Sequence, residues 1–138
     1  MSGEKSLFVL DSYALLAFLE GEAGMERVRE VLIDAERGGA EVYLSWINLG
    51  EVLYITERER GLQQARETLA IIHSLPVQLL EVTCQAVLDA AHIKASHRLA
   101  YADAFAAAAA LEKGAGVLTG DPEFESVAAI VRIEWLER

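Results

Sequence analysis

The sequence predicts a single α/β domain over residues 1–138, in which a mostly parallel sheet lies between helices. Five short runs of the β type alternate with longer segments whose apolar residues recur at helical spacing. Strands that alternate with helices are joined by right-handed crossovers, and these make the strands of the sheet parallel. A chain of 138 residues, 53% of them apolar, is suited to one domain with a hydrophobic core and is unlike a disordered chain.

The first strand is predicted at residues 7–10, a continuous apolar run typical of a central strand that is covered on both faces. This run ends at Asp11, and a helical pattern follows at once. Ser45 is expected to cap a later helix. The other elements predicted in the first half of the chain are helices at 13–19 and 25–37, a strand at 41–44, and helices at 46–60 and 62–74.

The second half of the chain continues the alternation. Pro76 ends the preceding helix, Thr83 is expected to cap the next one, and Gly114 closes an alanine-rich helix. The predicted elements are a strand at 77–82, a helix at 84–96, a connector at 97–101, a helix at 102–113, a strand at 116–119, a turn at 120–123 into a short helix, and a last strand at 131–135.

The composition excludes several function classes. Twelve basic and 22 acidic residues give a net charge of −10, which argues against an extended surface that grips phosphates and favours a basic protein partner. A nucleic-acid enzyme that uses metal ions as its positive charge stays open. Cys84 is the single cysteine, so neither a disulfide framework nor a cysteine metal site is expected. The sequence shows no membrane-spanning run and no signal peptide, so we expect a cytoplasmic protein with no membrane association.

Four acidic residues stand where solvated carboxylates are not expected. Asp11 directly follows the first predicted strand, and Asp121 comes two residues after the strand at 116–119. Glu51 and Asp103 lie on faces of predicted helices whose neighbours three and four residues away are largely apolar. Ligands of open parallel sheets bind in the crevice beyond the carboxyl ends of the strands. The four acids are therefore candidates for one shared site.

Each acid taken alone has a simpler interpretation. Asp11 and Asp121 could cap the helices that follow them, and Pro122 strengthens this interpretation for Asp121. Glu51 could extend to the surface, and Asp103 could interact with the dipole of its helix. If all four converge, however, their mutual repulsion requires protons or a cation. Ligand sets made only of oxygen select hard cations, Mg²⁺ or Mn²⁺, and a carboxylate-held pair of such ions hydrolyses phosphodiesters.

The four acids and their neighbouring residues resemble the PIN domain, and within it the VapC-type toxin ribonucleases of type II toxin–antitoxin pairs. The resemblance extends over nearly the whole chain and depends on the ordered set of four segments, since no single segment is specific. The matching segments are residues 9–16, 48–52, 102–104 and 118–121.

The resemblance implies a three-layer sandwich with a five-stranded parallel sheet in the order 3-2-1-4-5. It implies a Mg²⁺- or Mn²⁺-dependent endoribonuclease that acts on structured RNA such as tRNA or rRNA, a homodimer, and a cognate antitoxin that places an arginine among the acids. Carried over by position, the catalytic and metal-binding quartet is Asp11, Glu51, Asp103 and Asp121. Thr119 matches a family Thr/Ser that orients a carboxylate or a water molecule. Supporting roles for Ser12 and Asn48 are weaker expectations, and at Asn48 many relatives carry Ser or Thr.

Two other interpretations compete with the nuclease. A phosphoacceptor receiver domain is also an acidic α/β protein, but it needs an acidic pair after the first strand and an Asp after the third, where this chain has Ser12 and Thr83. A non-catalytic PIN-fold module for binding or dimerisation is the second alternative. The complete acidic quartet argues against that module, because an inactive site has no reason to keep mutually repelling charges.

Overall fold

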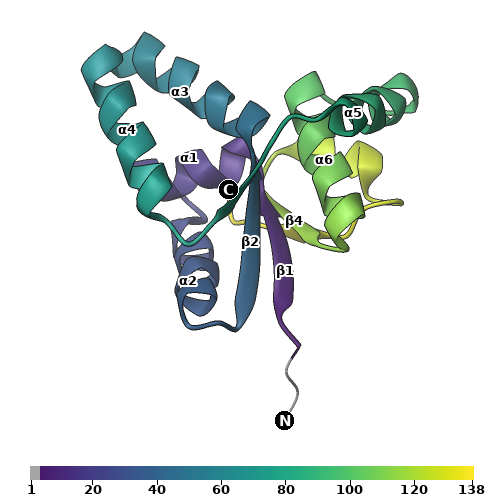
Figure 1. Cartoon of the computed structure of the whole chain (residues 1–138), viewed down its shortest axis with the longest axis horizontal. Helices are drawn as coiled ribbons and strands as arrows, with labels where there is room; N and C mark the ends of the chain where they lie inside the picture. Colours follow the sequence, from purple (N-terminus) through teal and green to yellow (C-terminus); the bar gives the residue numbers. More distant parts are fainter. Residues whose placement is uncertain (1–3) are drawn as a thin grey trace.

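The computed structural model describes residues 4–138 and shows helices alternating with the strands of one sheet (Figure 1). Every predicted helix and strand is present. In chain order the elements are β1 (Ser6–Leu10), α1 (Ser12–Glu20), α2 (Met25–Glu36), β2 (Ala40–Ser45), α3 (Trp46–Arg60), α4 (Leu62–Ser74), β3 (Gln78–Leu80), α5 (Cys84–Ser96), α6 (Tyr101–Lys113), β4 (Gly116–Thr119), the 3₁₀ helix η1 (Pro122–Val127) and β5 (Ile133–Trp135).

The sheet has the strand order β3-β2-β1-β4-β5, and all four pairings are parallel. β1 is the central strand, and Val9 and Leu10 on it are completely buried, as its continuous apolar run predicted. The expected order 3-2-1-4-5 is therefore confirmed. A receiver domain has the order 2-1-3-4-5, so the topology excludes that interpretation.

Two hydrophobic cores lie on opposite faces of the sheet. On one face, Leu10 and Leu118 pack against α1 to α4. On the other, Val9 and Val117 pack against α5, α6 and η1. Figure 1 shows the two groups of helices on either side of the strands, which gives the three layers that the family resemblance implied. Alternate residues of each central strand face opposite cores, as the pleat of a strand requires.

The two edge strands are shorter than predicted. β3 covers Gln78–Leu80 and not 77–82, and β5 covers Ile133–Trp135 and not 131–135. An edge strand pairs on one side only, so its last residues lack a partner that would hold them extended. A smaller difference is that α6 begins at Tyr101, one residue before the predicted start.

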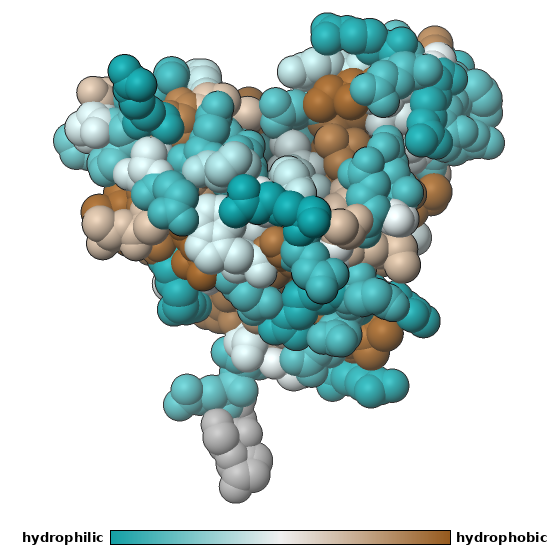
Figure 2. Space-filling view, turned by 180° about the vertical axis from the view of Figure 1, so that it is seen from behind, coloured by the Kyte–Doolittle hydropathy of each residue, from teal (hydrophilic) through white to brown (hydrophobic). Residues whose placement is uncertain are grey.

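The topology brings several helix starts to one edge of the sheet. The parallel strands end at the same edge, and α1 and α3 begin directly after β1 and β2 there. In the space-filling view the molecule is hollowed between its two groups of helices (Figure 2). Within the described residues, no helix is both long and apolar enough to cross a membrane. Residues 1–3, at the end of the chain where no signal peptide is expected, lie outside the described part.

Candidate metal centre

Asp11 links the end of β1 to the start of α1. One carboxylate oxygen, Oδ1, accepts a hydrogen bond of 2.8 Å from the backbone N–H of Ala14 and so caps the helix. The other oxygen, Oδ2, accepts a bond of 2.5 Å from the hydroxyl of Thr119 on β4. The residue is 1% exposed. Capping and membership of an acid cluster are thus compatible, because each uses a different oxygen.

Thr119 connects two of the predicted acids. Its hydroxyl donates to Asp11 and accepts a bond of 2.9 Å from the backbone N–H of Asp121. Asp121 in turn caps η1, since its Oδ1 accepts a bond of 2.9 Å from the N–H of Glu123. Thr119 is fully buried, so its single hydroxyl fixes the relative positions of the two strand ends. The structure therefore brings Asp11 and Asp121 together.

Glu51 reaches the same region from α3. The hydroxyl of Ser12 donates a bond of 2.5 Å to Oε1 of Glu51. The amide group of Asn48 donates to the hydroxyl of Ser12 at 3.3 Å and to the carbonyl of Ala102 at 3.2 Å. Asn48 is completely buried and joins α1, α3 and α6. These three helices carry or follow Asp11, Glu51 and Asp103, so the bonds hold the acid-bearing elements in register.

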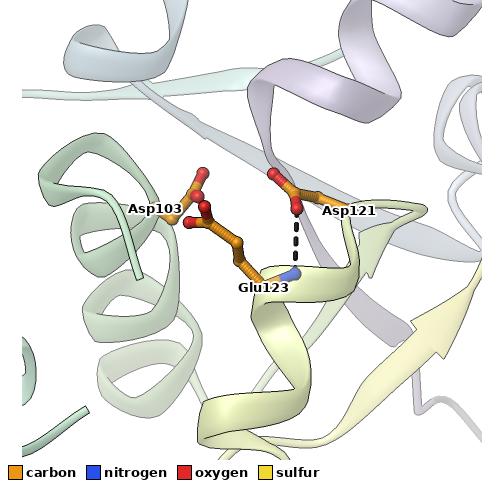
Figure 3. Close-up of side chains that lie close together, drawn as sticks. All are labelled: Asp103, Asp121 and Glu123. Atoms are coloured by element: carbon orange, nitrogen blue, oxygen red, sulfur yellow. Dashed lines mark hydrogen bonds between the residues drawn. The ribbon is translucent and has the colours of Figure 1, made fainter. Parts of the chain in front are cut away.

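Three carboxylates from α6, the turn after β4 and η1 point toward one another (Figure 3). One ligand oxygen each from Asp103, Asp121 and Glu123 lies within 4.8 Å of the other two. Asp103 is 7% exposed, although it sits in the first turn of its helix. This trio, called the acid cluster below, contains two of the four predicted acids together with one that was not predicted.

Glu123 was missed from the sequence. It was assigned to the turn at 120–123, and nothing in that pattern indicates that η1 folds back toward the start of α6. In the structure its Oε1 accepts a bond of 2.9 Å from the backbone N–H of Ala100, 23 residues away in sequence. One available signal was its position two residues after Asp121, in the first turn of the helix that Asp121 caps.

The electrostatics of the site favour proton uptake when no cation is bound. Burial, above all, raises the pKa of Asp11 to about 7, although its bonds to Thr119 and Ala14 oppose the rise. Burial also raises the pKa of Asp103 to about 8, and the charges of Asp121, Asp11, Glu51 and Glu123 add to the rise in that order. Glu51 therefore lies close enough to influence the cluster electrostatically. The neighbouring charges thus disfavour ionisation of Asp103, as expected for like charges in a shared site.

The protein does not neutralise these charges itself. From residue 4 to 138, no Lys, Arg or His nitrogen forms an ion pair with a carboxylate of the acid cluster, of Asp11 or of Glu51. All the ion pairs in this part of the chain involve other acidic residues. The amide oxygen of Asn48 is also buried without a hydrogen-bond partner among the described residues. Carboxylate oxygens without His or Cys are the donor set preferred by Mg²⁺ and Mn²⁺. The residues present therefore fit a hard divalent cation.

Comparisons with solved structures identify toxin–antitoxin proteins with this fold. The chain is similar to VapBC2 of Rickettsia felis, bound to a DNA fragment from its promoter, with 14% identity, a TM-score of 0.73, and 95% of this chain and 99% of that chain covered. It is also similar to VapC20 of Mycobacterium tuberculosis, described as a toxin that cleaves the sarcin–ricin loop, with 24% identity, a TM-score of 0.69, and 91% and 96% covered. VapBC of Salmonella typhimurium, bound to DNA, gives 21% identity, a TM-score of 0.73, and 94% and 97% covered.

At these identities the structural likeness shows the fold. Among proteins with a curated description, none matches the sequence. The sequence itself matches the family model of the PIN domain over residues 8–130, which is most of the chain. The resemblance inferred from the four acidic segments is thus confirmed, and the chain belongs to the PIN domain family.

Proposed function

We propose that this protein is a Mg²⁺- or Mn²⁺-dependent endoribonuclease and the toxin of a VapC-type toxin–antitoxin pair. The observation that carries the proposal is the convergence of five carboxylates at the carboxyl edge of a parallel sheet, where no cationic side chain among residues 4–138 pairs with them. Hydrolysis of phosphodiesters by carboxylate-held divalent ions needs such a site. The family membership and the RNA-cleaving activity of the similar VapC20 both support this assignment.

The acidic residues of the site divide into cation ligands and a proton acceptor in the proposed mechanism. Asp103, Asp121 and Glu123 would hold a divalent cation, and Asp11 would complete its ligand set. Such a cation, when bound, supplies an activated water molecule and stabilises the charge of the leaving oxygen. Thr119 keeps Asp11 in place through its 2.5 Å bond.

Glu51 is the proposed proton acceptor. Ser12 occupies its Oε1, so Oε2 can accept the proton of the attacking water. In-line attack by water leaves 5′-phosphate and 3′-hydroxyl ends and requires no covalent bond to the protein.

The proposed nuclease function also indicates which molecules this protein binds. RNA is the proposed substrate, with tRNA and rRNA as the leading classes, because the similar VapC20 is described as cleaving the sarcin–ricin loop. A cognate antitoxin is proposed because similar structures are VapBC complexes, and the net charge of −10 favours a basic inhibitor segment. A homodimer and a cytoplasmic site of action, where RNA is available, complete the proposal.

The decisive experiment is digestion of total RNA by the purified protein with Mg²⁺ or Mn²⁺. Discrete cleavage products are expected from the wild type, and none from Asp103→Asn. Asp89→Asn is the matched control, since Asp89 lies on α5 and its carboxylate accepts a bond from Gln85. If the wild type and Asp103→Asn both leave every RNA intact, the non-catalytic binding module is the correct interpretation.

A further inference from the structure

Two cationic side chains line an open depression directly beside the acid cluster. Lys94 lies near the end of α5 and Arg98 in the connector before α6; together with Leu99, Ala100 and Glu123 they surround a volume of about 460 Å³. Glu123 is also a member of the acid cluster. One carboxylate therefore separates the candidate cation site from a positively charged depression.

Neither of these cations is neutralised by a carboxylate. Five basic residues form ion pairs in the described part of the chain, namely Lys5, Arg27, Arg29, Arg60 and Lys113. Lys94 instead donates a bond of 2.8 Å to the carbonyl of Leu99, which fixes its ammonium group at the depression. In a chain with a net charge of −10, two cations without acidic partners beside an acidic site are available for an anionic ligand.

We infer that Lys94 and Arg98 form a subsite for a backbone phosphate of RNA, next to the phosphodiester at the acid cluster. This inference rests on the proposed nuclease function and names how the substrate is positioned. The ammonium and guanidinium groups donate charge-assisted hydrogen bonds to phosphate oxygens. Binding of the strand across Glu123 would place one phosphate on the cations while the neighbouring linkage lies over the carboxylates.

The lining of the depression favours contact with the RNA backbone over stacking of bases. Leu99 and Ala100 contribute no aromatic ring on which a base could stack, and stacking platforms are the usual means of holding single-stranded bases. Phosphate contacts position a nucleic acid without carrying sequence information. The subsite therefore contributes affinity and register, and the RNA sequence or shape must be recognised elsewhere.

The test compares Arg98→Ala and Lys94→Met with Arg37→Ala. Arg37 is the matched control because it is exposed, follows α2 and precedes β2, which places it at the opposite edge of the sheet. Binding of a fluorescent mixed-sequence RNA oligonucleotide is measured by anisotropy at several salt concentrations, in an Asp103→Asn background that prevents cutting. KM and kcat for the same RNA are measured in the otherwise wild-type protein with Mg²⁺.

Loss of either cation should raise Kd about tenfold or more, as expected for one charge-assisted hydrogen bond. It should also lower the salt slope of log Kd by about 0.7, the value for one phosphate contact to a single strand. In cleavage assays, the loss should raise KM and leave kcat unchanged. Arg98→Lys should recover part of the RNA affinity. Arg37→Ala should have the same Kd, KM and kcat as the protein into which it is introduced.

Equal effects of Arg98→Ala and Arg37→Ala would overturn the subsite, because general charge would then explain the binding. If the wild type nevertheless cleaves RNA, the proposed nuclease function is still supported although the subsite is refuted. Conversely, RNA binding that depends on Arg98 in a protein that cuts no RNA would support the subsite and refute the nuclease activity.

Discussion

Replacement of Asp103 by Asn should stabilise the protein when no divalent cation is present. The ligand oxygens of the acid cluster lie within 4.8 Å of one another, and two unit charges at that distance repel by about 3.5 kcal/mol at an effective dielectric constant near 20. Partial protonation relieves part of this repulsion, because the pKa of Asp103 is raised to about 8. The substitution should therefore recover about 2 kcal/mol at about pH 8.5, more than the roughly 0.5 kcal/mol lost from the interaction with the helix dipole.

Thermal unfolding in a chelating buffer measures this effect. For a chain of 138 residues, a gain of about 2 kcal/mol corresponds to a rise in Tm of about 7 °C. With Mg²⁺ present the order should reverse, since saturating cation stabilises the wild type by about 2.7 kcal/mol at a concentration 100 times Kd. Asp89→Asn should change Tm little in either buffer. A lower Tm for Asp103→Asn in the chelating buffer at about pH 8.5 would show that repulsion within the acid cluster does not destabilise the folded protein.

Three further predictions concern the same site. Folded-state pKa values of about 7 for Asp11 and about 8 for Asp103 exceed the unfolded value, so the folded protein binds more protons. The stability gap between Asp103→Asn and the metal-free wild type should widen as pH rises from about 5 to 8, and an unchanged gap in thermal melts would contradict this. Asn48→Leu removes one buried and one partly buried hydrogen bond and should cost about 1–3 kcal/mol in urea unfolding and weaken Mg²⁺ binding. Thr119→Val should cost a similar amount, about 1–3 kcal/mol, and weaken Mg²⁺ binding even in molecules that remain folded, because Asp11 loses its 2.5 Å bond.

The fold was predictable because its local signals agree with its topology. The apolar run of β1 indicated a strand buried on both faces, and Val9 and Leu10 are completely buried. Alternation of strands and helices predicted parallel pairing, which all strand pairs show. The ends of β3 and β5 were predicted less well, because propensity alone does not reveal where an edge strand loses its hydrogen-bonding partner.

The position of the site was partly predictable for the same reason. Asp11 and Asp121 follow β1 and β4, and these strands are neighbours in the sheet, so topology alone brings the two acids close together. Asp103 was indicated by an apolar helical face, and it is buried. Glu123 was not predicted as a site residue, because its position depends on how η1 folds against the connector before α6.

The roles of these residues can be tested apart from any RNA. Titration calorimetry with Mn²⁺ measures directly whether the acid cluster binds divalent cations. We predict saturable binding by the wild type that strengthens from about pH 6 to 8.5, because the cation displaces protons from the raised-pKa carboxylates. Asp103→Asn should bind much more weakly, whereas Asp89→Asn should match the wild type. An absence of saturable heat from the wild type, or equal binding by Asp103→Asn, would show that the acid cluster is not a site for divalent cations.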